Sequence, residues 1–186
     1  MPSLIIICGD GRLKERDDFL FDYYWELDGT RPYRMMNAGA GNVLEGEVGD
    51  RLLEHSGLFL KTVGHIHIEQ HMAVGTIPGC AQYRDTHERY GSDEGHVPGL
   101  LYPPSLEEQQ HRSTLGASAR KIRQYQAESI HRPPSTIAQC LYRFTDRDVN
   151  GEAEIIASDR ELPGFVSEPS MAGRVQQFRR TGTINN

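Results

Sequence analysis

Apolar and polar residues follow two periods along the chain, and these periods predict its helices and strands. Four consecutive aliphatic residues, Leu4 to Ile7, predict a short strand buried on both faces of a sheet. Between 13 and 27 apolar residues recur three and four positions apart, which is typical of an amphipathic helix. The same reasoning predicts helices over 43–60 and 106–130 and strands over 33–36, 63–71, 136–144 and 153–157. Together these elements predict an α/β fold, a mainly parallel central sheet flanked by helices.

The pattern of elements indicates one domain, because 186 residues suffice for a single buried core. We place this domain at 1–160. The stretch from Tyr83 to Pro104 is polar, rich in Gly, Pro and charge, and too long for an ordinary connection. It is an insertion, either a cover over a site or a mobile segment. Residues 161–186 show little periodicity and are expected to form an irregular tail.

Composition narrows the class of protein. The formal net charge is -6, the hydrophobic fraction is 37%, and no apolar run approaches the ~20 residues of a membrane span. The N-terminal apolar run is too short for a signal peptide, and three scattered cysteines do not resemble a disulfide framework. Basic residues form no stripe. We expect a cytoplasmic protein with no membrane or nucleic-acid partner.

The exit of the first strand carries candidate chemistry. Cys8, Asp10 and Arg12 stand at alternate positions, so in an extended segment their side chains point to one side. A thiolate suits zinc, a carboxylate accepts a proton or a hydrogen bond, and a guanidinium can hold that carboxylate in place. The alternative is an ordinary buried cysteine followed by a turn.

The strand predicted at 63–71 is the second informative stretch. His65, His67, Glu69 and His71 alternate with apolar residues and therefore share one face of the strand. Three imidazoles and a carboxylate on one face suggest a metal ion. The alternative is a polar face turned toward solvent or an interface.

In order along the chain, these motifs resemble the β-class carbonic anhydrases. The resemblance rests on Cys8-x-Asp10-x-Arg12, Arg34, Asn37-Ala38-Gly39, the strand ending at His71, and the strand 137–144 with its Asn150-Gly151 turn. It covers about residues 4–157, with 83–104 unmatched. It implies a β-carbonic-anhydrase-like fold, zinc ligands at Cys8 and His71, and a catalytic pair of Asp10 and Arg12.

The sequence departs from the family at Val74, where the family has its second zinc cysteine. The nearest soft substitute is Cys80, nine residues after His71 across a segment that contains Gly75 and Gly79. We predict that Cys80 completes the site, although an ordinary buried thiol is the alternative. Glu69 and His67 are weaker candidates, and Asp10 is a further one. Cys140 lies on a later strand, where burial explains it.

The resemblance implies a zinc-dependent lyase that hydrates carbon dioxide to bicarbonate, or acts on a similar small electrophile, by metal-bound hydroxide. Asn37, Ala38 and Gly39 would line the substrate pocket, and the unit would be a homodimer. The alternative is a family member without catalysis that serves as a binding or assembly protein. Because Cys8 and His71 must meet, the strand at 4–7 should lie next to the strand at 63–70.

Overall fold

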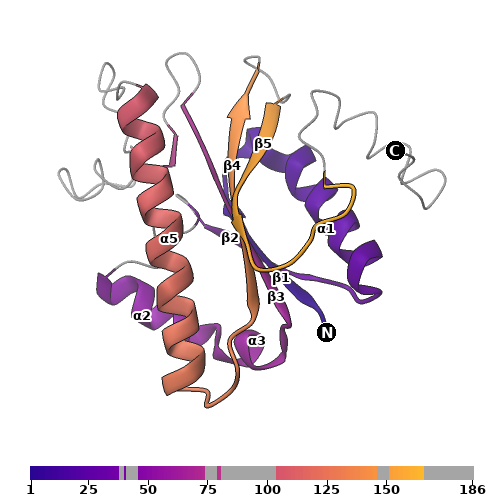
Figure 1. Ribbon diagram of the computed structural model, residues 1–186, viewed down its shortest axis with the longest axis vertical. Helices are drawn as coiled ribbons and strands as arrows, with labels where there is room; N and C mark the ends of the chain where they lie inside the picture. Colours follow the sequence, from indigo (N-terminus) through magenta and orange to yellow (C-terminus); the bar gives the residue numbers. More distant parts are fainter. Residues whose placement is uncertain (38–39, 41–45, 74–78, 81–103, 146–150, 166–186) are drawn as a thin grey trace.

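The computed structural model describes residues 1–37, 40, 46–73, 79–80, 104–145 and 151–165, and this part of the chain forms one twisted sheet between helices (Figure 1). The strand order is β2-β1-β3-β4-β5. The strands are β1 (Ser3–Cys8), β2 (Tyr33–Asn37), β3 (His65–His71), β4 (Thr136–Phe144) and β5 (Gly151–Ser158). All neighbours pair in parallel except β4 and β5, which are antiparallel. The predicted α/β class and mainly parallel sheet are therefore confirmed.

Helices cover both faces of the sheet (Figure 1). A single 3-10 turn (Gly11–Leu13) leads into α1 (Lys14–Asp28), which covers one face. The opposite face is covered by α2 (Gly46–His55), α3 (Gly57–Thr62) and α5 (Pro104–Glu128). The chain leaves α1 through Gly29, whose φ of 64° lies in the left-handed region that favours glycine. No helix in the described ranges is long and apolar enough to cross a bilayer.

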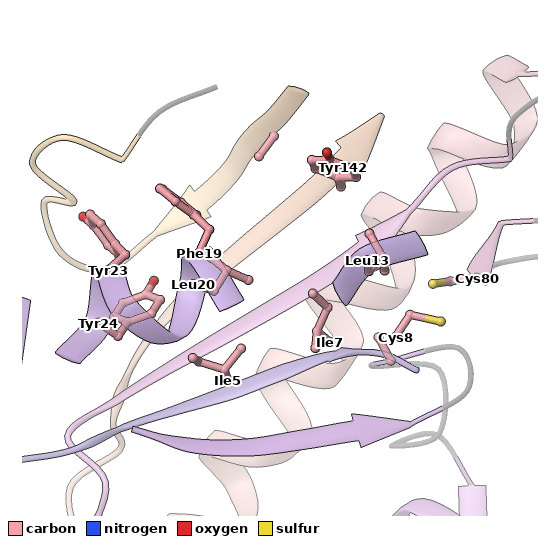
Figure 2. Close-up of a cluster of buried hydrophobic side chains, with 12 residues drawn as sticks. Ile5, Ile7, Cys8, Leu13, Phe19, Leu20, Tyr23, Tyr24, Cys80 and Tyr142 are labelled. Carbon is pink, nitrogen blue, oxygen red and sulfur yellow. The ribbon is translucent and has the colours of Figure 1, made fainter. Parts of the chain in front are cut away.

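The aliphatic run of β1 separates two hydrophobic cores. Ile5 and Ile7 pack with Phe19 and Leu20 of α1, as Figure 2 shows. Leu4 and Ile6 point to the other face, into a cluster with residues of α2, α3 and α5. All four are essentially inaccessible to solvent. This burial on both faces explains why β1 lies inside the sheet, between β2 and β3.

The prediction of one continuous helix over 43–60 is wrong. The structure has two helices, α2 and α3, and residues 43–45 lie outside the described residues. The break falls at Ser56, and α3 begins at Gly57, a residue that favours helices much less than most others. Leu58 is 71% exposed because α3 turns it away from the sheet.

The topology sets the position of a site. The connection from β1 to β2 runs through α1 on one face, whereas the connection from β3 to β4 runs through α5 on the other. The chain therefore leaves β1 and β3 toward different faces, and such a switch point opens a crevice at the carboxyl ends of parallel strands. Cys8 ends β1 and His71 ends β3, and the predicted pairing of these two strands is confirmed.

Two predicted features fall mostly outside the described part. The insertion expected at 83–104 overlaps residues 81–103, and most of the tail expected at 161–186 lies in residues 166–186, neither of which the structure describes. The described start of the tail packs on α1, where Tyr23 donates a hydrogen bond to the Pro163 carbonyl oxygen, 3.0 Å away.

Candidate metal centre

Three of the predicted site residues meet at the carboxyl end of the sheet. Cys8, His71 and Cys80 each contribute a sulfur or ring nitrogen, and these atoms all lie within 4.8 Å of one another. All three side chains are buried. Figure 2 shows the sulfur atoms of Cys8 and Cys80 directed toward the same space at the edge of the core cluster. The structure thus brings Cys80 beside Cys8 and His71, the two residues at which the resemblance implies zinc ligands.

The chemistry and spacing of these donors fit a zinc ion. Zinc takes thiolate sulfur at about 2.3 Å and imidazole nitrogen at about 2.0 Å, so tetrahedral ligand atoms stand roughly 3.5 to 4 Å apart. The observed cluster falls within small side-chain adjustments of that spacing. Two soft sulfurs and one imidazole favour a transition metal such as zinc over magnesium or calcium, which prefer oxygen. Three protein ligands leave a fourth position for water or substrate.

His71 is oriented by its own backbone neighbour. Its Nδ1 lies 3.1 Å from the Met72 carbonyl oxygen, so Nδ1–H donates and Nε2 is the nitrogen that can accept a proton or a metal. Burial by itself lowers the pKa of His71, but contact with Cys8, assisted by Met72 and Asp10, raises it above the ordinary 6.5. A metal ion would replace that proton on the imidazole.

Cys80 is held by the strand that carries His71. Its Sγ accepts a hydrogen bond from the His71 backbone N–H, at 3.4 Å. Burial and the neighbouring Cys8 raise the pKa of Cys80 well above 9.0. The thiol therefore keeps its proton in the metal-free protein, and a bound cation would be needed to deprotonate it.

Asp10 and Arg12 form the expected pair beside the three donors. The carboxylate caps the 3-10 turn by accepting from the Arg12 backbone N–H at 2.9 Å, and Arg12 Nε donates to its two oxygens at 3.0 and 3.1 Å. Asp10 Oδ2 lies 3.8 Å from His71 Nε2. Burial raises the pKa of Asp10, but Arg12 and His71 outweigh it and lower the pKa below 3.8. Asp10 is therefore an ionised acceptor facing the centre, and it is engaged by Arg12.

Phe144, which sequence reasoning did not single out, contacts both Arg12 and His71. The Arg12 guanidinium carbon lies 4.6 Å from the centroid of its ring, and the His71 ring meets it edge-on at 5.6 Å. These contacts restrict how Arg12 and His71 can turn. The signal in the sequence is its position at the end of β4, two residues beyond Tyr142, which is in register with His71.

The residues predicted to line the substrate pocket are only partly described. Asn37 ends β2, and its backbone is in register with Cys8. Ala38 and Gly39 lie outside the described residues. Arg34, part of the family resemblance, pairs with α1 through Asp17 at 3.0 Å and stacks on the Phe21 ring. Arg34 therefore ties β2 to α1.

The polar face of β3 does not act as one metal site, and it is not solvated. His65, His67 and Glu69 are buried beneath α1, apart from His71. Arg16, also buried, donates to both oxygens of Glu69 at 2.7 and 2.6 Å. This ion pair lowers the pKa of Glu69 to about 2, despite the opposing effect of burial.

The Glu69 carboxylate fixes a chain of hydrogen bonds. Because ionised Glu69 only accepts, His67 Nε2–H donates to it at 3.2 Å, and His67 Nδ1 then accepts from the Tyr24 hydroxyl at 2.9 Å. Tyr24 oxygen in turn accepts from His65 Nε2–H at 3.2 Å. Both histidines are therefore neutral, and burial lowers the pKa of each, that of His65 to about 3.

The same network argues against a second metal centre. His67, Glu69 and Cys140 also bring donor atoms within 4.8 Å of one another. However, Arg16 already neutralises Glu69, and both His67 nitrogens are engaged. A cation there would lie beside the buried Arg16 guanidinium, so this group serves the fold.

Acid is expected to destabilise the protein through His65. The unfolded chain protonates this residue near pH 6.5, but the folded chain only near pH 3. Its contribution to stability is therefore complete above pH 6.5 and is lost as the pH falls toward 3. Between pH 7 and 5 the loss is about 2 kcal/mol. Urea unfolding at the two pH values measures it.

His65→Gln should make the free energy of unfolding less dependent on pH over this interval, since glutamine does not titrate. The matched control is His55→Gln, because His55 is exposed on α2 and should leave the pH dependence unchanged. Equal pH dependence in wild type and His65→Gln would show that His65 does not carry the effect.

The comparisons with known proteins give no family. No protein-family model matches the chain, and a search of curated proteins found no significant match. The resemblance to β-class carbonic anhydrases therefore rests on the sequence motifs.

Proposed function

We propose that this protein is a zinc-dependent lyase of the β-carbonic anhydrase type, which hydrates carbon dioxide to bicarbonate or acts on a similar small electrophile. The observation that supports it best is the meeting of Cys8, His71 and Cys80 beside the Asp10–Arg12 pair. The departure at Val74 would leave two ligands, and Cys80 supplies a third donor at the place where it is needed.

The chain's own residues have separable roles in this proposal. Cys8, His71 and Cys80 would hold a zinc ion, which supplies the Lewis acidity that makes water nucleophilic near neutral pH. Asp10 accepts a hydrogen bond from the nucleophile and turns its lone pair toward the substrate. Arg12 keeps Asp10 ionised and fixed, and Phe144 restricts Arg12. Arg12 Nη1 is buried without a hydrogen-bond partner among the described residues, so it retains a donor for an anionic product.

The proposed homodimer stays a prediction from the resemblance. Exposed apolar side chains near the outer strand β2 support it: Tyr33, Met36 and Phe59 are each more than a third exposed, and the rings of Tyr33 and Phe59 lie 4.7 Å apart. An edge strand with apolar neighbours is a common place for association. The cytoplasmic location likewise remains a prediction.

Asp10→Asn tests the proposed chemistry. Asparagine still caps the 3-10 turn but carries no charge, so we expect the rate of carbon dioxide hydration to fall by about 100-fold, the scale of a lost general base, with zinc content unchanged. Stopped-flow measurement with a pH indicator follows the reaction, and metal analysis follows zinc.

The matched control is Asp18→Asn, an equivalent change at a partly exposed residue of α1 that pairs with Arg34. It should leave the rate unchanged. Zinc-loaded wild-type protein that does not hydrate carbon dioxide above the uncatalysed rate would contradict the lyase. A folded protein that takes up no zinc would favour the binding or assembly protein instead.

A further inference from the structure

The metal centre has a buried carboxylate behind it that the proposed mechanism does not use. Glu107 lies on the first turn of α5 and is almost inaccessible to solvent. Its Oε1 accepts a hydrogen bond from the Ala73 backbone N–H at 2.8 Å. Ala73 follows His71 by two residues, so Glu107 holds the backbone just after the end of β3.

The same oxygen lies against the residue that precedes Cys80. A Cβ placed on Gly79 would stand 2.1 Å from Glu107 Oε1, 2.6 Å from the Ala73 nitrogen and 2.7 Å from the His71 carbonyl oxygen. No side chain fits in that space. Glu107 therefore contacts both ends of the segment that joins His71 to Cys80, and glycine at 79 permits the close approach.

A second pair of side chains fixes Glu107 itself. His111, one turn further along α5, lies 3.5 Å from Glu107 Oε1 through its Nε2. Its Nδ1 lies 2.9 Å from Oε1 of Gln70, the residue before His71. All of these side chains are buried. The first two turns of α5 thus contact the chain both before His71, at Gln70, and after it, at Ala73.

We infer that Glu107 is a positioning residue for the metal centre, which sets where Cys80 stands relative to Cys8 and His71 by holding Ala73 and Gly79 against α5. This role rests on the proposed function, because the metal ion that the positioned residues would bind belongs to that proposal. The position of the Cys80 thiol relative to Cys8 can nevertheless be measured both with and without metal.

The first test reads the position of Cys80 in metal-free, reduced protein. Diamide oxidises neighbouring thiols to a disulfide and is itself reduced, and mass spectrometry of proteolytic peptides quantifies the Cys8–Cys80 cross-link. We expect Glu107→Ala to slow this cross-link by tenfold or more. Glu107→Gln, which keeps an oxygen for the Ala73 N–H, should stay near the wild-type rate.

The matched control is Glu108→Ala. Glu108 is the next residue of α5, but it is partly exposed, and within the described residues it pairs with two surface arginines, Arg112 at 2.8 Å and Arg143 at 3.1 Å. It should leave the cross-link unchanged. A helix-docking role alone would lower stability in Glu107→Ala without changing the cross-linking rate of the folded protein.

Gly79→Ala tests the same contact from the other side, and it decides the matter if Glu107→Ala does not fold. The added methyl group must push Gly79 away from Glu107, so the cross-link should slow although Glu107 is intact. In zinc titrations, Glu107→Ala and Gly79→Ala should each lose about 10- to 100-fold in affinity, the usual cost of disturbing groups that support metal ligands.

The outcomes separate this inference from the proposed function. The positioning role would be overturned if folded Glu107→Ala or Gly79→Ala protein kept the wild-type rate of cross-linking and the wild-type zinc affinity. That result would not affect the proposed zinc centre. Slowed cross-linking in these variants of a protein that binds no zinc would support the positioning role and overturn the zinc centre.

Discussion

Cys80→Ala is expected to lower zinc affinity by more than about 100-fold and to abolish carbon dioxide hydration with it. Disturbing groups that merely support metal ligands already costs about 10- to 100-fold, and this change removes a donor outright. Cys80 is one of three donors within 4.8 Å of one another, so its loss leaves only Cys8 and His71 in that group. Titration with zinc in the presence of a competing chelator measures the affinity.

Cys8→Ser should lose zinc as well, because a hydroxyl is a much poorer ligand than a thiolate. Cys140→Ala is the matched control. Cys140 is just as buried, but it lies beside His67 and belongs to the other cluster. It should keep wild-type zinc affinity and activity. Wild-type affinity in Cys80→Ala would refute the assignment of Cys80 as a ligand.

The second large effect concerns stability. Arg16→Met is expected to reduce the free energy of unfolding at pH 7 by about 3–5 kcal/mol, because it leaves the Glu69 carboxylate buried without its counter-charge. Arg16 and Glu69 form a bidentate pair, and each side chain is only 1% exposed. Urea unfolding of the wild-type and Arg16→Met proteins measures the loss. Methionine is chosen because it fills much of the same buried space without a charge.

The double variant Arg16→Met/Glu69→Gln should recover at least half of the stability, since neither charge is then buried. Arg112→Met is the surface control: Arg112 pairs with Glu108 and Glu154 but is largely solvated, so its loss should cost less than about 1 kcal/mol. An Arg16→Met protein as stable as this control would show that Glu69 does not need its partner.

The central strand and its role were predictable because the signal is local. Leu4 to Ile7 offer no polar side, so only a position with apolar residues on both faces can bury them, and β1 has that position. The pairing of β1 with β3 followed from a chemical requirement, that Cys8 and His71 meet. The helix over 43–60 was wrong because periodicity does not reveal a break at Ser56.

The surroundings of the site were less predictable, because they depend on residues distant in sequence. His67 and Glu69 share a strand face with His71, yet Arg16 of α1 and Tyr24 take them into a separate buried network. Nothing in the alternation on β3 identifies those partners. The ligand role of Cys80 stays a prediction, but its placement beside Cys8 depends on contacts such as that of Glu107, which lies 27 residues further along the chain.

The zinc content of the purified wild-type protein tests whether Cys8, His71 and Cys80 hold a metal ion. Protein prepared under reducing conditions, supplied with zinc and then dialysed against metal-free buffer should retain about one zinc ion per chain, measured by atomic emission. Cys8→Ser and Cys80→Ala proteins treated in the same way should retain little. A folded wild-type protein that retains no zinc after dialysis would contradict the proposed zinc centre.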